Sequence, residues 1–132
     1  MEKIHKTEQE WRAILKPEQY RVMREQATEP AFSCPSDMPK SGGVYHCVAC
    51  DLPLFLAGAK FESGTGWPSY YEPMTPDAIE EWPDDLSGMH RTEVRCGRCE
   101  SHLGHVFSDG PPPSGKRYCI NSLALQFKPE RV

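Results

Sequence analysis

Residues 1–30 carry the polar and apolar spacing of two short helices. The sequence TEQE that begins at Thr7 is a capping box, in which Thr7 accepts from first-turn amides and Glu10 reaches back. We expect a helix from there to about Leu15. Pro17 suits the first turn of a second helix, PEQYRVMREQAT, which Pro30 must end because proline lacks the amide hydrogen that a helix needs.

From Ala31 onward, short runs of apolar and polar residues are separated by segments rich in Gly, Pro, Ser and Asp. Such a pattern is typical of short strands joined by turns. MTPDAIEEW predicts one or two helical turns, and DGPPPSGK predicts a loop or tight turn. We therefore expect a small, mainly β domain with mostly antiparallel pairing, whose β-prone runs are GVYHCV, LPLFLAGAKFES, HRTEVRC, HLGHVFSD and RYCINSLALQF.

The length and net charge of the chain limit the number of domains and the kinds of partner that it can have. A chain of 132 residues and 15.0 kDa fits one domain over residues 1–132, with a helical N-terminal segment (1–30) and a β core (31–128). The net charge of -4 lacks the basic surplus that phosphate binding requires, which argues against a nucleic-acid partner. No apolar run approaches the ~20 residues of a membrane span, and the N-terminus lacks a secretory signal. We therefore expect a cytoplasmic monomer, without a membrane partner, whose thiols stay reduced.

Four of the six cysteines form two Cys-x-x-Cys pairs, Cys47 with Cys50 and Cys96 with Cys99. In a reducing compartment this is typical of a closed tetrahedral zinc site, because each tight turn directs two thiolates to one ion. The metal would connect two distant turns and so hold the β core together. Two local disulfides, one redox-active pair and iron bound by four thiolates are the alternatives. A site filled by four thiolates has no open position, so any catalysis must come from other residues.

The two remaining cysteines, Cys34 and Cys119, have different neighbours. Cys119 follows Arg117 in RYCINS and lies downstream of HLGHVFSDG, which supplies two histidines and an aspartate. A nearby guanidinium or imidazolium would lower the pKa of the thiol and raise its reactivity. The alternative is that Cys119 is simply a small buried side chain on an apolar-alternating strand.

Two histidines and a tryptophan complete the set of candidates. His102 and His105 lie upstream of Cys119 and suit proton transfer near neutral pH, although each can alternatively pack in the core with satisfied nitrogens. In SGTGWPSYYEP, glycines flank Thr65 and precede Trp67, so the loop can present an indole face to a small apolar group. Alternatively, Trp67 fills the core.

The two Cys-x-x-Cys pairs, SGTGWPSYYEP, HLGHVFSDGP and RYCINS, in their order along the chain, closely resemble the methionine-R-sulfoxide reductases, the B class. The resemblance extends from about Thr7 to Phe127. It implies two small antiparallel sheets with short N-terminal helices, and a structural zinc that holds the β core together. The residues that it assigns are the nucleophile Cys119, the sulfoxide-positioning His105 and Asn121, the thiol-activating Arg117, the methyl-receiving Trp67, the further substrate-site residues His102 and Asp109, and the zinc ligands Cys47, Cys50, Cys96 and Cys99.

The activity that the resemblance implies is reduction of the R epimer of methionine sulfoxide, in oxidised proteins or free, to methionine. The Cys119 thiolate would attack the sulfur while an acid, His105 in this assignment, protonates the departing oxygen, and Cys119 would become a sulfenic acid. An aromatic wall for the methyl group and donors for the oxygen would accept one sulfur epimer and reject the other.

Many members of the family have a recycling cysteine in the loop before the tryptophan, in the sequence S-G-C-G-W-P. This chain has Thr65 at that position. Cys34 is then the one cysteine without a role, and its neighbours Pro35 and Asp37 predict an exposed loop that can move. We expect Cys34 to attack the Cys119 sulfenic acid, and thioredoxin to reduce the resulting disulfide. The alternative is that Cys34 is incidental and that thioredoxin or a small thiol reduces the sulfenic acid directly.

Two other classes of function fit parts of the sequence. A zinc-stapled peptide-binding module without catalysis would make Cys119 structural, and a different thiol oxidoreductase would act on disulfides. HLGHVFSDGP and RYCINS favour the sulfoxide reductase over both. A plain zinc module needs neither the isolated cysteine nor the clustered histidines.

Overall fold

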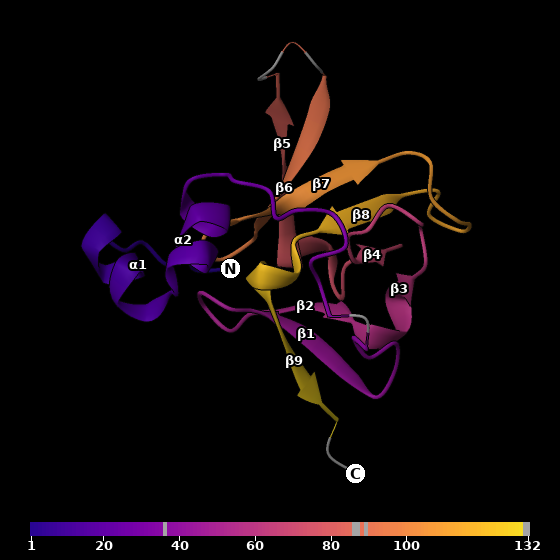
Figure 1. Cartoon of the computed structure of the whole chain (residues 1–132), viewed down its shortest axis with the longest axis horizontal. Coiled ribbons are helices and arrows are strands. Elements are labelled where there is room, and N and C mark those ends of the chain that lie inside the picture. The colour runs from indigo at the N-terminus through magenta and orange to yellow at the C-terminus, as the bar shows by residue number, and fades with distance from the viewer. Residues whose placement is uncertain (36, 86–87, 89, 131–132) are drawn as a thin grey trace.

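Two antiparallel sheets form the body of the molecule (Figure 1). A computed structural model describes residues 1–35, 37–85, 88 and 90–130. The three-stranded sheet has the order β2 (Pro53–Leu56), β1 (Gly43–Cys47) and β9 (Leu125–Pro129). The six-stranded sheet has the order β3 (Lys60–Phe61), β4 (Ser69–Tyr70), β8 (Arg117–Ile120), β7 (His102–Phe107), β6 (Arg91–Cys96) and β5 (Ile79–Asp84). The predicted mainly β class with two antiparallel sheets is confirmed.

Two short helices precede the sheets and lie together at one side of the molecule (Figure 1). The first, α1 (Glu8–Ile14), begins at the predicted capping box. The Glu10 amide donates to Thr7 Oγ1 at 3.1 Å, and the Thr7 amide donates to Glu10 Oε1 at 2.9 Å. No helix in the described ranges has both the length and the apolar character that crossing a membrane requires.

The second helix is shorter than the sequence predicted. It is α2 (Pro17–Arg24), and it ends before Gln26, whose left-handed φ of 58° cannot continue a right-handed helix. The Ala27 amide then donates to the Arg21 carbonyl at 2.9 Å and closes the helix end. The prediction of a helix over the whole of PEQYRVMREQAT was therefore wrong in its last residues, because a backbone turn that the sequence did not signal comes before Pro30.

Short 3₁₀ turns connect strands of one sheet to strands of the other. The turn η1 (Ala57–Ala59) joins β2 to β3, and η4 (Ser122–Ala124) joins β8 to β9. Two of the β-prone runs, LPLFLAGAKFES and RYCINSLALQF, therefore each supply strands to both sheets. MTPDAIEEW forms only one such turn, η2 (Pro76–Ala78), before it continues as β5. The prediction of one or two helical turns is therefore met by one, and the residues after it pair with β6.

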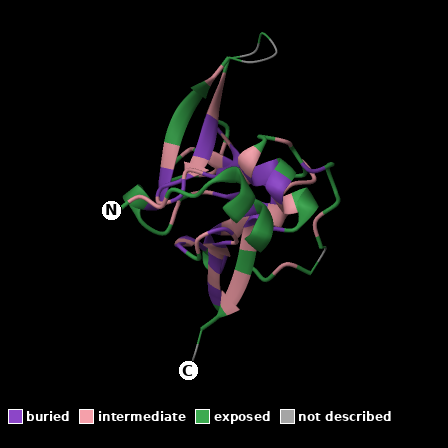
Figure 2. Cartoon of the chain, turned by 90° about the vertical axis from the view of Figure 1, so that its left-hand side faces the viewer, coloured by how far each residue is buried: buried purple, intermediate pink, exposed green. Residues whose placement is uncertain are grey.

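Aromatic side chains from both sheets pack together in the core. Phe55 of β2 stacks on Tyr70 of β4 with ring centroids 4.5 Å apart, and Tyr45 of β1 meets the same tyrosine edge-on at 5.6 Å. Along β1, buried and half-buried residues alternate, as the colours in Figure 2 show. The helices cover the core from one side, where Met23 of α2 is 1% exposed. The two sheets are therefore joined by packing as well as by the chain.

The pairing of β7 with β8 brings several candidate residues together. His105 lies directly opposite Cys119, and Phe107 lies opposite Arg117. Gly104 allows the two backbones to approach closely, since a Cβ there would lie 2.0 Å from the Cys119 carbonyl oxygen. Directly paired residues of antiparallel strands face the same side of the sheet. The imidazole, the thiol and the guanidinium therefore share one face.

Candidate functional site

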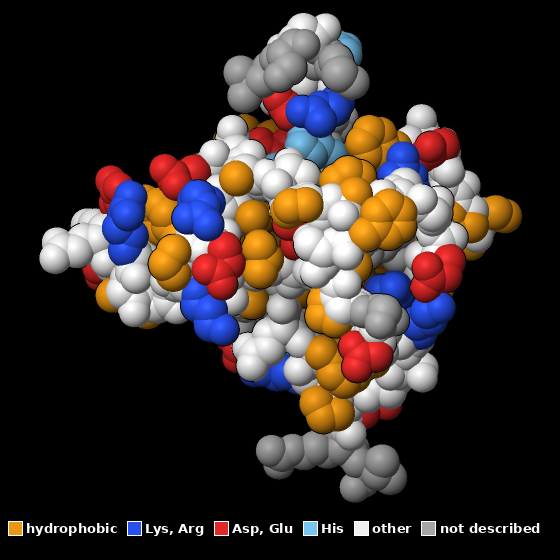
Figure 3. Space-filling view, in the orientation of Figure 1, with side chains coloured by type: hydrophobic (Ala, Val, Ile, Leu, Met, Phe, Trp, Pro, Cys, Tyr) orange, Lys and Arg blue, Asp and Glu red, His pale blue; other side chains and the backbone are white. Residues whose placement is uncertain are grey.

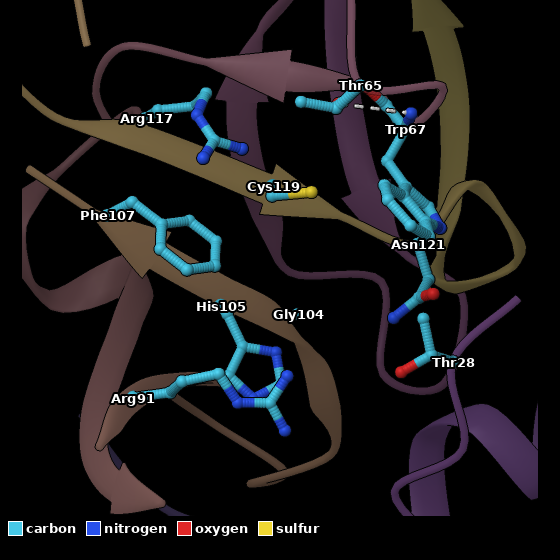
Figure 4. Close-up of a pocket in the computed structure, with 10 residues that line it drawn as sticks. All are labelled: Thr28, Thr65, Trp67, Arg91, Gly104, His105, Phe107, Arg117, Cys119 and Asn121. Carbon is cyan, nitrogen blue, oxygen red and sulfur yellow. Dashed lines mark hydrogen bonds between the residues drawn. The ribbon is translucent and has the colours of Figure 1, made fainter. Parts of the chain in front are cut away.

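A cavity of about 230 Å³ lies on that face of the six-stranded sheet. Strands β7 and β8, the loop before β4 and the segment after α2 surround it (Figure 4). Figure 3 shows histidine side chains at the surface below the projecting β5–β6 hairpin, among interspersed acidic, basic and apolar groups. The lining residues are Thr28, Thr65, Trp67, Arg91, Gly104, His105, Phe107, Arg117, Cys119 and Asn121.

Cys119 belongs to the open face of β8 and not to its core face. Its neighbours Tyr118 and Ile120 are 4% and 0% exposed, whereas Cys119 is only half-buried. Its sulfur points toward the side of the cavity that Trp67 occupies (Figure 4). A thiol in this position is accessible to a ligand.

Burial raises the pKa of the Cys119 thiol above its ordinary value, although Arg117 and Thr65 both lower it. The effect of Arg117 has the predicted sign, but desolvation of the thiolate outweighs the nearby guanidinium. At neutral pH the free protein therefore holds Cys119 mainly as the thiol.

Arg117 is fixed in place by two neighbours. Its guanidinium lies 4.4 Å above the Phe107 ring and donates to Asp109, from Nε to Oδ1 at 3.0 Å and from Nη2 to Oδ2 at 3.2 Å. The Asp109 side chain is 67% exposed and does not line the cavity. The structure therefore places Asp109 behind Arg117, and its predicted contact with substrate stays a prediction.

His105 has a carboxylate partner that the sequence did not indicate. His105 Nε2 lies 2.8 Å from Asp84 Oδ2, and Arg91 Nη2 donates to the same oxygen at 3.4 Å. The His105 and Asp84 side chains are both 13% exposed. A carboxylate that accepts from Nε2 fixes the imidazole ring and leaves Nδ1 as the nitrogen that can exchange a proton with a ligand.

His102 lies behind His105 and does not line the cavity. It is 3% exposed, its Nδ1 lies 2.7 Å from Glu93 Oε2, and its ring meets the His105 ring edge-on at 5.5 Å. Burial lowers the pKa of His102, although Glu93 raises it. The structure therefore places the His102 ring against the candidate acid His105 from the buried side, and its predicted substrate contact stays a prediction.

Trp67 is held by a chain of hydrogen bonds that includes Asn121. Trp67 Nε1 donates to the Glu29 carbonyl at 2.8 Å, and the Glu29 amide donates to Asn121 Oδ1 at 2.9 Å. Asn121 Nδ2 donates in turn to the Leu103 carbonyl at 2.9 Å. The buried Glu29 carboxylate accepts from Ser122 Oγ at 3.0 Å. Asn121 therefore positions the indole through the Glu29 backbone, besides lining the cavity.

Cys34 lies on the other side of the loop that carries Trp67. Its sulfur donates to the Gly66 carbonyl at 3.7 Å, and it lines a second cavity of about 260 Å³ that shares Trp67 with the first. Cys34 and Cys119 are both free thiols. The Phe32 amide holds the same Gly66 carbonyl at 2.7 Å. A bond between the two sulfurs therefore requires movement of the Cys34 segment relative to this loop.

The two Cys-x-x-Cys pairs form equivalent turns at the ends of β1 and β6. The Asp51 amide donates to the Cys47 carbonyl at 2.8 Å, and the Glu100 amide donates to the Cys96 carbonyl at 2.9 Å. Asp51 and Glu100 have the left-handed φ values of 69° and 60°. Since β1 and β6 belong to different sheets, the cysteine cluster connects the sheets, as the sequence predicted.

The four sulfur atoms fit one metal ion. All lie within 4.8 Å of one another, with Cys47 and Cys99 3.7 Å apart and Cys50 and Cys96 3.5 Å apart. Zn–S bonds of about 2.3 Å place the sulfurs of a tetrahedron about 3.8 Å apart. Hydrogen bonds within the cluster, first of all between Cys47 and Cys50, raise the pKa of Cys47 and lower that of Cys50. The cluster is therefore already arranged as a metal site.

Sequence reasoning missed several residues at the cavity. Thr28, Arg91 and Phe107 line it, and Asp84 holds His105. Successive residues of HRTEVRC face opposite sides of the sheet. This alternation could have placed Arg91 on the face that also carries His105. Glu29 left no signal, because it holds Trp67 through a backbone carbonyl.

Comparisons with known proteins identify the family of the chain. The SelR domain model matches residues 15–129. The peptide methionine sulfoxide reductase MsrB of Pseudomonas putida (strain W619) is 57% identical over 129 residues, 98% of this chain and 97% of that protein. The MsrB of Thiobacillus denitrificans is 57% identical over 125 residues, 95% of each chain. That of Agrobacterium fabrum is 52% identical over 127 residues, 96% of this chain and 94% of that protein. The resemblance seen in the sequence is confirmed, and the chain belongs to the SelR domain family of methionine-R-sulfoxide reductases.

Proposed function

We propose that the chain is a thiol-dependent peptide-methionine (R)-S-oxide reductase, acting on methionine sulfoxide in oxidised proteins and on the free amino acid. The observation that carries the proposal is the half-buried Cys119 thiol in a cavity walled by the Trp67 indole and the His105 imidazole. The names of the MsrB relatives support it.

The cavity suits a substrate with one apolar and one polar substituent on sulfur. The Trp67 indole offers an apolar face for the methyl group, and its orientation is fixed through Glu29. His105 lies on β7, directly paired with Cys119 and apart from the indole, and offers a donor for the oxygen (Figure 4). One epimer then directs its oxygen to the imidazole, whereas the other would direct it against the indole.

The chemistry is a two-electron transfer between two sulfur atoms. The Cys119 thiolate attacks the sulfoxide sulfur while His105 protonates the oxygen, which makes the S–O bond breakable. The new bond between the two sulfur atoms then breaks as the protonated oxygen passes to the Cys119 sulfur, so methionine leaves and the thiol is oxidised to a sulfenic acid. Arg117, which lowers the pKa of Cys119 against the opposing effect of burial, helps form the thiolate.

Recycling uses the second free thiol. The Cys34 thiolate attacks the sulfenic sulfur of Cys119, a disulfide forms, and the hydroxyl leaves as water after taking a proton. Thioredoxin then supplies two electrons and two protons by thiol–disulfide exchange and restores both thiols. The position of Cys34 supports this route, because its sulfur donates to the Gly66 carbonyl and its cavity shares Trp67 with the cavity that holds Cys119.

Zinc is the ion that we assign to the four-cysteine site. Cys47, Cys50, Cys96 and Cys99 would hold it, and four thiolates suit zinc in tetrahedral geometry. When bound, it supplies no chemistry to the reaction and stabilises the connection between the sheets. This assignment presumes a reducing compartment, for which we propose the cytoplasm.

The activity is tested with separated epimers of a methionine sulfoxide peptide and dithiothreitol as reductant. We expect consumption of the R epimer alone, and no consumption by Cys119→Ser. Equal consumption of both epimers would contradict the proposed stereochemistry. Binding of the peptide without consumption would favour the zinc-stapled binding module instead.

A further inference from the structure

Glu29 is a buried acidic residue whose side chain takes no part in the proposed chemistry. It lies between α2 and β1 and is 3% exposed. Its Oε1 accepts from the Leu123 amide at 3.0 Å, and both of its carboxyl oxygens accept from Ser122 Oγ at 3.0 Å. Burial of a carboxyl group is costly unless such donors are present. The side chain therefore binds this segment to η4, the turn that follows the strand of Cys119.

The peptide groups of the same residue hold two side chains of the cavity. The Glu29 carbonyl accepts from Trp67 Nε1 at 2.8 Å, and the Glu29 amide donates to Asn121 Oδ1 at 2.9 Å. In Figure 4, Trp67 and Asn121 lie on the same side of the cavity, and Arg117 lies on the other. Glu29 itself is not among the residues that line the cavity. One residue behind the cavity therefore connects two of the side chains that line it.

The indole of Trp67 depends on Glu29 more than the backbone of Trp67 does. The next residue, Pro68, accepts from the Ile120 amide at 3.0 Å, so the chain at this point is already joined to β8. The tryptophan side chain can still adopt different rotamers about its χ angles. Its Nε1 donates to the Glu29 carbonyl, so the orientation of the indole follows the position of that carbonyl.

The position of the carbonyl depends in turn on the Glu29 side chain. Glu29 belongs to no helix or strand, so no regular ladder of hydrogen bonds holds its backbone. The Phe32 amide donates to the Gly66 carbonyl at 2.7 Å, but this contact joins the segment to the loop of Trp67 and not to β8. Together with the amide contact to Asn121, the carboxyl contacts with η4 therefore fix Glu29 against the end of β8.

We propose that Glu29 is a positioning residue that sets the epimer preference of the reaction, because its carboxyl contacts with η4 hold the peptide groups that orient Trp67 and Asn121. The proposal rests on the proposed function, in which the indole receives the methyl group and so distinguishes the two epimers. Asn121 is held by the same residue, so loss of the carboxyl group loosens two lining side chains together.

The test compares Glu29→Ala, which removes the contacts with η4, with Glu29→Gln, which keeps them. The glutamine oxygen can accept from the Leu123 amide, and its NH₂ group can donate to Ser122 Oγ. Rates are measured with separated epimers of a methionine sulfoxide peptide and dithiothreitol. In Glu29→Ala, kcat/KM for the R epimer should fall about tenfold, because small misplacements of positioning groups are costly. The value for the S epimer should not fall, so the epimer preference narrows, and Glu29→Gln should match the parent.

A second measurement follows the Trp67 indole without any substrate. The chain has three tryptophans, and the Trp67 Nε1–H signal in a ¹H–¹⁵N spectrum is the one that Trp67→Phe removes. A hydrogen-bonded N–H exchanges with solvent only when its bond opens. Glu29→Ala should therefore speed exchange of this proton about tenfold, since loss of one hydrogen bond to a charged group is of that size or larger. Glu29→Gln should leave the exchange rate unchanged.

Tyr45→Phe is the matched control, because it removes a part-buried side-chain hydrogen bond, from Tyr45 Oη to the Pro39 carbonyl at 2.6 Å, away from the cavity. Its epimer preference and its indole exchange should equal those of the parent. Ser122→Ala provides a second variant in case Glu29→Ala does not fold. It should change both quantities in the same direction by a smaller factor, since the Leu123 amide contact remains.

Parent-like indole exchange in a folded Glu29→Ala protein, or in Ser122→Ala, would overturn the proposal. Equal impairment of Glu29→Gln and Glu29→Ala would also overturn it, because the contacts with η4 would then not be the cause. Faster exchange with an unchanged epimer preference would refute the link to specificity. A parent protein that consumes neither epimer would refute the proposed function, and the exchange rates would still decide whether Glu29 positions Trp67.

Discussion

The cysteine cluster and the isolated Cys119 use the same side chain in two different environments. Cys47, Cys96 and Cys99 are 0%, 0% and 3% exposed, and each has another thiol of the cluster as a partner, besides the Ser101 hydroxyl that lies 3.1 Å from the Cys99 sulfur. Cys119 is half-buried and faces a hydroxyl, a guanidinium and an open cavity. The cluster therefore suits a closed metal site, and the cavity suits a nucleophile.

All of these cysteines except Cys50 and Cys99 lie on strands, so the two kinds of cysteine differ mainly in the residues that surround and follow them. Cys47 and Cys96 end strands and are followed by tight turns that return a second thiol to the first. Cys119 lies inside β8, opposite His105, and the turn η4 that follows this strand carries no second cysteine. The backbone that follows each cysteine thus distinguishes the structural thiols from the reactive thiol, and variants can test this distinction.

The largest expected effect comes from breaking the cluster. Cys96→Ser should lose the metal and lower the free energy of unfolding by more than about 5 kcal/mol, because binding of a structural zinc contributes of the order of 10 kcal/mol. Metal content by mass spectrometry and denaturant unfolding measure the two effects. Cys34→Ser, the same chemical change outside the cluster, should keep the metal. Loss of metal from both variants would contradict the assignment of the cluster.

Cys119→Ser should abolish activity without affecting the fold. We expect activity to fall by about a thousandfold or more, since the nucleophile is removed. The metal should remain bound, and the free energy of unfolding should change by less than about 1 kcal/mol. Residual activity within tenfold of the parent would show that another thiol is the nucleophile.

Cys34→Ser should separate the first turnover from later ones. The first turnover should proceed at the parent rate, whereas steady-state turnover with thioredoxin should fall by about tenfold or more, because the sulfenic acid has lost its resolving thiol. Adding Thr65→Cys to this variant places a thiol beside Cys119 and should restore part of the turnover. Parent-like turnover of Cys34→Ser with thioredoxin would instead favour direct reduction.

The last prediction concerns the unmodified protein and the pH dependence of its thiol reactivity. Burial raises the pKa of Cys119 above its ordinary value of 9.0, so the thiolate fraction rises about tenfold per pH unit below that pH. Alkylation of Cys119 in the parent should rise accordingly from pH 6 to 8, as ~tenfold steps. The four cluster thiols should stay unlabelled while metal is bound. A plateau below pH 8 would contradict the raised pKa.

Much of the fold could be predicted because local signals agreed with it. The capping box at Thr7, the alternating runs and the two Cys-x-x-Cys pairs each specify a local structure that the fold keeps. The errors occurred where tertiary contacts decided the outcome. Gln26 ends α2 in a left-handed turn, and the residues after Ala78 extend to pair with β6. The single-domain organisation over residues 1–132 stays a prediction.

The site was predicted in part for a similar reason. Cys119, Trp67 and His105 carry side-chain chemistry that a sequence displays, and the structure brings all three to one cavity. Asp84 and Glu29 contribute to the site only because the fold brings them to it. Asp84 holds His105 from the end of a distant strand, and Glu29 holds Trp67 through its backbone carbonyl. No local pattern reveals a partner of that kind.

The most direct test of the account is thiol mapping after one turnover of the reduced, metal-loaded protein with the R epimer. We predict one equivalent of methionine, a disulfide between Cys34 and Cys119 in the peptide map, and four unmodified cluster cysteines. Product accompanied by a disulfide within the cluster, or by loss of the cluster thiols, would contradict the division of the cysteines into structural and reactive groups.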